Sequence, residues 1–164
     1  MANMDKAEGA EVDTQPNAAL KWLVYAAQFF FGGWFLVHGL NHWMHFFTQP
    51  PGSSPISHEL ISALIDSGLF TVVKGLEVLT GIMLLANRFV PLAIVLAFPV
   101  AISIAYLDLI ANPDLFGTVT AVVIMTLISV MALGHLDKYL PMLRMNQGDP
   151  SELGLRRLFQ GKAD

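Results

Sequence analysis

Four long apolar stretches alternate with short polar segments along the chain. The stretches cover residues 22–47, 60–87, 89–110 and 116–135. A helix needs about 20 apolar residues to cross a hydrocarbon core of roughly 30 Å, and each stretch is long enough. Phe89–Leu107 and Val119–Leu133 contain almost no polar positions, so neither has the polar face of a helix in a soluble bundle. The pattern predicts an all-α, integral membrane four-helix bundle over residues 20–136.

The segments between the stretches predict the connections. Residues 1–19 read as a mobile polar tail, and Thr48–Ser57 as a turn-rich loop before a single second helix. The Asn87–Arg88 turn is so short that the helices on either side must be antiparallel neighbours. Residues 137–164 are predicted to form a tail in which SELGLRRLFQ makes a short helix at the membrane surface.

Basic residues outside the apolar stretches predict the orientation. They lie only in the N-terminal tail, the second connection and the C-terminal tail: Lys6, Lys21, Arg88, Lys138, Arg144, Arg156, Arg157 and Lys162. The other two connections contain no Lys or Arg. Because cytoplasmic segments of membrane proteins retain positive charge, we expect both termini in the cytoplasm and a multi-pass location in a bacterial inner (plasma) membrane.

Composition agrees with a lipid bilayer as the surroundings. Hydrophobic residues make up 54% of the chain and charged residues 13%, against about 25% charged in a soluble domain. The net charge is −4 with no basic patch, so nucleic acid is not an expected partner. The chain has no cysteine, which excludes disulfide exchange and sites bound by thiolates.

Ionisable residues inside the apolar stretches carry the candidate chemistry, because each costs about 2.5–3.5 kcal/mol in a bilayer. His38, His42 and His45 are spaced i, i+4, i+7 and should share one face of the first helix. Lys74 and Glu77 share a face of the second, and Asp108 lies near the end of the third. Depth along the helices groups His38, His42, Lys74 and Asp108 in the outer half, with Glu77 nearer the midplane.

Three interpretations of this cluster remain open. It could be structural, with Lys74 paired to Glu77 or Asp108 and the histidines bonded across helices. His38, His42, Lys74, Glu77 and Asp108 could instead line a pocket for a small ligand, a proton or a quinone headgroup. A metal or haem site is disfavoured, because His135 lies at the opposite end and His58 outside the membrane. The aromatic run Phe29–Phe31, with Trp34 and Phe35, is expected to face lipid.

Residues 22–134 resemble the DoxX-like family of small four-helix membrane proteins. The resemblance is carried by FFFGGWFLVHGLNHW and by KGLEVLTGIMLLANRFVPLAIVL, whose matching positions are Glu77, Gly81, Leu84, Leu85, Arg88 and Pro91. The three histidines of the first stretch are not part of the family pattern. The resemblance implies an accessory or quinone-side membrane subunit of a redox assembly, with a membrane-protein partner or a homo-oligomer. The alternatives are a small-solute or proton transporter module, and a structural or assembly subunit without chemistry of its own.

Overall fold

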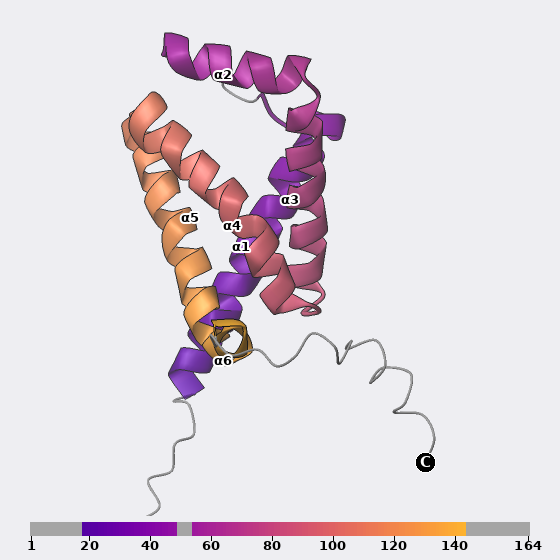
Figure 1. Ribbon diagram of the computed structural model, residues 1–164, viewed down its shortest axis with the longest axis vertical. Helices are drawn as coiled ribbons and strands as arrows, with labels where there is room; N and C mark the ends of the chain where they lie inside the picture. The colour runs from indigo at the N-terminus through magenta and orange to yellow at the C-terminus, as the bar shows by residue number, and fades with distance from the viewer. Residues whose placement is uncertain (1–17, 49–53, 144–164) are drawn as a thin grey trace, which may run out of the picture. The chain divides into compact units, whose positions relative to one another are not determined.

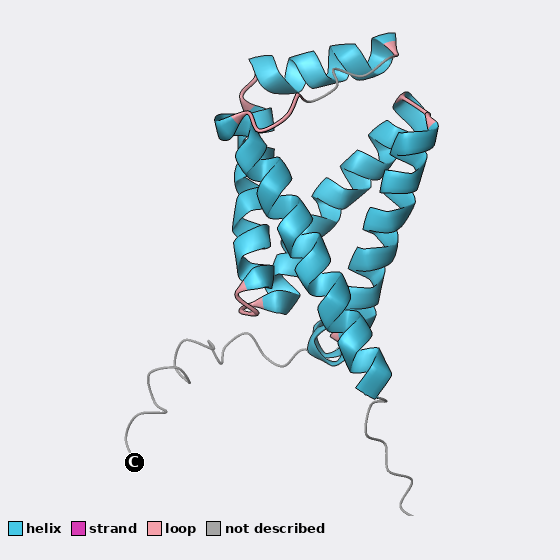
Figure 2. Cartoon of the chain, turned by 180° about the vertical axis from the view of Figure 1, so that it is seen from behind, coloured by secondary structure: helices cyan, strands magenta, loops and turns pink. Residues whose placement is uncertain are grey.

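The computed structural model describes residues 18–48 and 54–143, which form helices and short loops without strands (Figures 1 and 2). The helices up to Gly134 are α1 (Ala18–Met44), α2 (Pro55–Asp66), α3 (Leu69–Leu85), α4 (Val90–Tyr106), the π-helix η1 (Leu107–Ala111) and α5 (Leu115–Gly134). Residues up to Gly134 belong to one compact unit, and those from His135 belong to a second. The all-helical fold class predicted from the sequence is confirmed for the part of the chain that is described.

Three segments are long and apolar enough to cross a membrane: Ala18–Met44, Val90–Ala111 and Leu115–Gly134. Large apolar side chains cover their outer surfaces, including Phe30, Leu92 and Val122, each about half exposed. An outward-facing apolar surface of this extent is stable against lipid and unfavourable in water. The length and the apolar surface of these helices indicate a membrane protein.

The predicted second helix is wrong in one respect, because residues 60–87 do not form a single straight span. The chain bends by 85° between α2 and α3, and α2 already begins at Pro55, inside the expected loop (Figure 1). Gly68 at the bend has a φ of 77°, a left-handed conformation that glycine adopts without steric cost. Three helices, or four if the bent pair counts as one, can therefore cross a membrane.

The start of α2 is fixed by hydrogen bonds. Ser54 is the N-cap, its Oγ accepting from Ser57 N at 3.1 Å, and Pro55 occupies the first turn. Ser54 N also donates to Asn112 Oδ1 at 3.0 Å, and Ser54 Oγ donates to Ala111 O. The start of α2 is thereby tied to the end of η1.

α1 packs chiefly against α3, and α4 and α5 complete the core. Gly81 lets α1 and α3 approach closely: a Cβ there would lie 2.7 Å from Leu36 N and 2.9 Å from Gly32 O. Close contact at small residues is a principal source of stability between helices in membranes. Phe31 and Phe35 stack with ring centroids 4.2 Å apart and are fully buried, so the expectation that they face lipid is wrong.

The connection between α3 and α4 is the tight turn expected at Asn87–Arg88. Asn87 and Phe89 both have left-handed backbone conformations, with φ of 51° and 55°. Arg88 N donates to Met83 O at 3.0 Å, which closes the end of α3. α3 and α4 pack against each other, as the short turn requires.

The second unit begins with α6 (Leu136–Tyr139) and the 3₁₀ helix η2 (Leu140–Leu143). Lys138 Nζ lies 2.8 Å from Asp137 Oδ2 at the surface. The hydrogen bond from Lys138 lowers the pKa of the Asp137 carboxyl, and the same contact raises the pKa of Lys138. The predicted N-terminal tail, up to residue 17, and the predicted surface helix SELGLRRLFQ lie outside the described residues.

Candidate functional site

A cavity of about 730 Å³ lies between the ends of the helices on the side where α2 crosses. It is bordered by α1, α3, η1 and α5, with Ser57 and Ile61 contributed by α2. Its apolar lining includes Trp34, Phe35, Phe47, Ile104, Phe116 and Ile124. Its ionisable lining consists of His38, Lys74, Glu77, Asp108 and Asp114. Four of the five predicted site residues therefore line one cavity.

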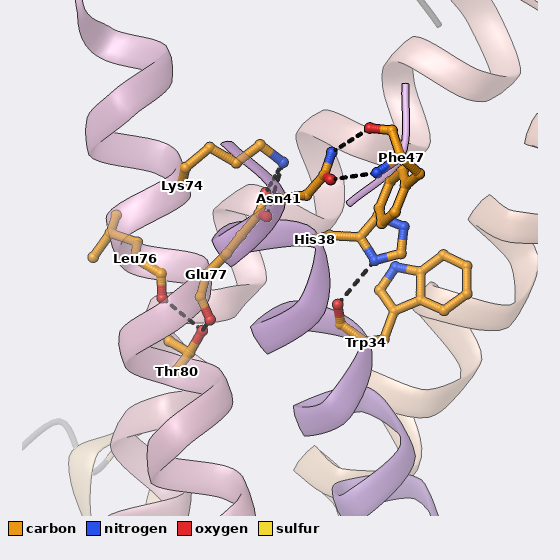
Figure 3. A network of polar contacts seen from close by, with 8 residues as sticks. All are labelled: Trp34, His38, Asn41, Phe47, Lys74, Leu76, Glu77 and Thr80. Carbon is orange, nitrogen blue, oxygen red and sulfur yellow. Dashed lines mark hydrogen bonds and ion pairs between the residues drawn. The ribbon is translucent and has the colours of Figure 1, made fainter. Parts of the chain in front are cut away.

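Lys74 and Glu77 form a buried ion pair within α3. Lys74 Nζ lies 2.9 Å and 2.8 Å from the two oxygens of the Glu77 carboxylate (Figure 3). The two side chains are 8% and 3% exposed. The expected pairing of Lys74 with a nearby carboxylate is confirmed, and its partner is Glu77 rather than Asp108. Lys74 Nζ also lies 5.2 Å from the centre of the Phe70 ring.

His38 is held by three contacts from two residues, Trp34 and Phe47. Its Nδ1 lies 2.9 Å from Trp34 O, one helical turn earlier. The Trp34 ring stacks on the imidazole with centroids 4.3 Å apart, and the Phe47 ring meets it edge-on at 5.1 Å (Figure 3). These contacts leave the half-buried imidazole one defined orientation at the wall of the cavity.

Asn41 fixes Phe47 in that arrangement. Asn41 Nδ2 donates to Phe47 O at 2.9 Å, and Phe47 N donates to Asn41 Oδ1 at 2.9 Å. The buried amide satisfies both backbone groups of Phe47, where the chain leaves α1. Asn41 thereby positions Phe47 beside the His38 ring.

The other two histidines do not join His38. His42 is not among the cavity-lining residues, and its Nε2 lies 3.0 Å from Thr71 Oγ1. α1 ends at Met44, so His45 lies beyond the helix, with a φ of 54° and an exposed side chain. The expected single face of three histidines is therefore wrong, because the helix stops before the third. Within residues 18–48 and 54–143, no group of three His, Asp or Glu is arranged to hold a metal ion.

Asp108 and Asp114 lie beside each other next to Gly117. A Cβ added to Gly117 would lie 3.3 Å from Asp108 Cγ and 3.0 Å from Asp114 Oδ1. Asp114 caps α5, since its Oδ1 accepts from Gly117 N. The half-buried Asp108 carboxylate has no hydrogen-bond or ion-pair partner among the described residues. Asp114 was not predicted as a site residue, because a Pro-Asp sequence in a tight turn reads as turn chemistry alone.

Gln28 is a buried polar residue that sequence reasoning also missed. It is fully buried on α1 and donates through Nε2 to Leu84 O at 2.8 Å and to Asn87 Oδ1 at 3.0 Å. Gln28 does not line the cavity. Its contacts join α1 to the turn between α3 and α4, so its role in this arrangement is structural.

Searches of protein families, of characterised proteins and of solved structures gave no match to this chain.

Proposed function

We propose that the chain crosses a bacterial inner membrane four times, as a four-helix bundle with both termini in the cytoplasm. α1, α3, α4–η1 and α5 would be the four spans. α3 has 17 residues, the lower limit for a span, and the 85° bend would place α2 along the outer surface. The distribution of Lys and Arg among the connections supports this orientation.

We further propose that the cavity binds a quinone-type molecule and that the chain is the quinone-side membrane subunit of a redox assembly. The observation that carries this proposal is a buried Lys74–Glu77 ion pair at the wall of a cavity of about 730 Å³. Ligand cavities commonly measure about 300–1,000 Å³, with mostly apolar walls and a few polar groups. A flat, largely apolar molecule with polar ring substituents matches such a lining.

A purely structural role accounts less well for the ion pair. Replacing a buried ion pair by apolar residues is often neutral or stabilising, so the pair needs a reason other than stability. Ionisable residues inside a membrane typically line a pathway or a binding site. The resemblance of KGLEVLTGIMLLANRFVPLAIVL to the DoxX-like family supports a redox partner as the assembly in which the site works.

One observation favours a second candidate, a proton or small-solute transporter module. Asp108 is half-buried, lines the same cavity and has no partner in the described part of the chain. A carboxylate of this kind could exchange protons with the outer side. The two candidates differ in what binds in the cavity and in what crosses the membrane.

Binding of a short-chain quinone to the purified protein in mild detergent tests the proposal. Quinones quench tryptophan fluorescence, and Trp34 is the cavity-lining tryptophan among the three in the chain. We expect saturable quenching that is largely lost in Trp34→Phe. Thr120→Phe should weaken binding by filling the cavity, whereas Val119→Phe, on the exposed face of α5, should not.

The same preparation distinguishes the candidates. Quinone in the lipid extract and redox subunits among the co-purifying proteins would support the main proposal. Proton uptake into liposomes without quinone binding would favour the transporter module. A protein that binds no quinone and transports nothing would contradict both.

A further inference from the structure

His38 is locked in one tautomer by its contact with the backbone. Its Nδ1 lies 2.9 Å from Trp34 O. A carbonyl oxygen can only accept a hydrogen bond, so Nδ1 carries the proton. In the neutral ring the other nitrogen, Nε2, then presents a lone pair and acts as an acceptor.

Within residues 18–48 and 54–143, His38 Nε2 has no hydrogen-bond partner. In that part of the chain, the one fully buried side-chain nitrogen or oxygen without a partner is Gln28 Oε1. His38 Nε2 is therefore not fully buried and retains accessible surface. His38 lines the cavity, and its ring is held between Trp34 and Phe47 (Figure 3). The acceptor is therefore available in a fixed direction before any ligand arrives.

The other ionisable groups of the cavity also favour a hydrogen-bond donor. Glu77 engages Lys74 through both carboxylate oxygens, which neutralises the one Lys in the lining. Asp108 offers carboxylate oxygens without a partner among the described residues. Asp108 and Asp114 leave the lining with an excess of negative charge, so a fatty acid or another anion would be repelled.

We propose that the cavity selects a neutral amphiphile with a ring hydroxyl, a quinol or related phenol, and that His38 Nε2 accepts the hydrogen bond from this O–H. The inference rests on the proposed function and narrows it to the reduced form of the ligand. A quinone carbonyl has no proton to offer His38 Nε2. Leaving a desolvated acceptor without a partner lowers affinity by about tenfold or more.

Three compounds with the same ring and tail test this selection. The probes are a short-chain quinol, its oxidised quinone and its dimethyl ether, titrated anaerobically into the full-length protein by calorimetry. The quinone is the close match in size, and the ether keeps both oxygens but carries a methyl group in place of each hydroxyl proton. We expect the quinol to bind about tenfold or more tightly than either of the others.

His38→Phe tests the assigned acceptor. Phe keeps an aromatic ring for stacking on Trp34 and removes Nε2, so quinol affinity should fall towards that of the ether. His42→Phe is the matched control, because His42 bonds to Thr71 and does not line the cavity; it should keep the full preference for quinol. A rescued preference in His38→Gln, whose amide oxygen restores an acceptor, would support the role of the hydrogen bond.

The outcomes separate this inference from the proposed function. Equal binding of quinol and ether to the wild-type protein would overturn the inference and leave quinone-type binding standing. Tighter binding of a lipophilic amine than of the quinol would also overturn it, in favour of a cation site. If none of the three compounds binds, the proposed function fails and the inference fails with it. The comparison of quinol, quinone and ether binding to the wild-type protein tests the selection for a hydroxyl group even if His38→Phe does not fold.

Discussion

Lys74 and Glu77, three residues apart on α3, form an ion pair in which Lys74 Nζ contacts both carboxylate oxygens, and the pair is almost completely shielded from solvent. The pair is one turn long, so α3 alone sets its geometry. Its environment comes from other elements, because α1, η1 and α5 enclose the cavity that it borders. The chain thus places a net-neutral but strongly polar group against an otherwise largely apolar wall.

Breaking this pair should be more harmful than removing it. Glu77→Gln leaves an ammonium group buried without its counter-ion and should cost about 3–5 kcal/mol of unfolding free energy. The double variant Lys74→Met/Glu77→Leu removes both charges and should lose much less than the sum of the two single changes. Denaturant unfolding in detergent of the wild type, Lys74→Met, Glu77→Leu and the double variant gives the four corners of the cycle, with Glu77→Gln as an additional single change.

The exposed pair of Lys138 and Asp137 is the matched control. Its side chains are 62% and 66% exposed, so Lys138→Met should leave the unfolding midpoint unchanged. Additive effects of the Lys74 and Glu77 substitutions would contradict a coupled buried pair.

Gly81 should tolerate no side chain, whereas Gly75 on the same helix should. A Cβ at Gly81 would meet the backbone of Leu36 and Gly32 at 2.7–2.9 Å, and backbone atoms cannot move aside locally. Gly81→Ala should therefore separate α1 from α3 and cost about 1–3 kcal/mol or more. Nothing lies within 4 Å of a Cβ at Gly75, so Gly75→Ala should be neutral or slightly stabilising. Thermal unfolding of the two variants in detergent gives the comparison, and equal melting temperatures would contradict it.

Part of the site follows from the sequence because its residues are close along the chain. The spacing of Lys74 and Glu77 is enough to predict that they share a face, and the ion pair is present. Helical rise from the predicted ends groups His38 with Lys74 and Asp108, and all three line the cavity. Helical spacing and estimated depth are therefore sufficient to predict that these residues lie at one site.

Other features depend on backbone conformation or on distant partners, and no periodicity reveals them. The bend at Gly68 interrupts an apolar run whose average hydropathy continues on both sides, so it reads as a single span. Gln28 bonds to residues 56 and 59 positions later in the chain, and one polar residue before an aromatic run gives no sign of those partners. His45 leaves the histidine face because α1 ends at Met44.

The turn between α3 and α4 should respond differently to two substitutions at Asn87. Asn87 has a φ of 51° and accepts a hydrogen bond from Gln28 at 3.0 Å. Asn87→Ala loses the hydrogen bond and keeps a β-carbon in the left-handed region, whereas Asn87→Gly loses the bond but also removes that β-carbon. The alanine variant should be less stable than the glycine variant by about 1 kcal/mol, measured by denaturant unfolding. The reverse order would show that the left-handed turn is not kept.

The proposed topology makes the last prediction, which concerns α2. The chain has no cysteine, so a single introduced cysteine can be labelled without background. Glu59 and Asp66 are exposed on α2, and Arg88 is exposed in the turn between α3 and α4. If α2 lies on the outer surface, a membrane-impermeant maleimide should label Glu59→Cys and Asp66→Cys in intact cells. Arg88→Cys should react only after the membrane is opened.

Ile56 provides a control on the same helix. It is apolar and 67% exposed, and at the proposed surface its side chain would be shielded by lipid. Ile56→Cys should therefore react more slowly than Glu59→Cys, although both side chains are free of protein cover. Reporter fusions at Gly52 and Pro113 should give the same outer location, and fusions after Arg88 and Lys162 the cytoplasmic one. Labelling of Glu59→Cys only after permeabilisation would show that the orientation is the reverse of the proposed one, with α2 and the cavity on the cytoplasmic side.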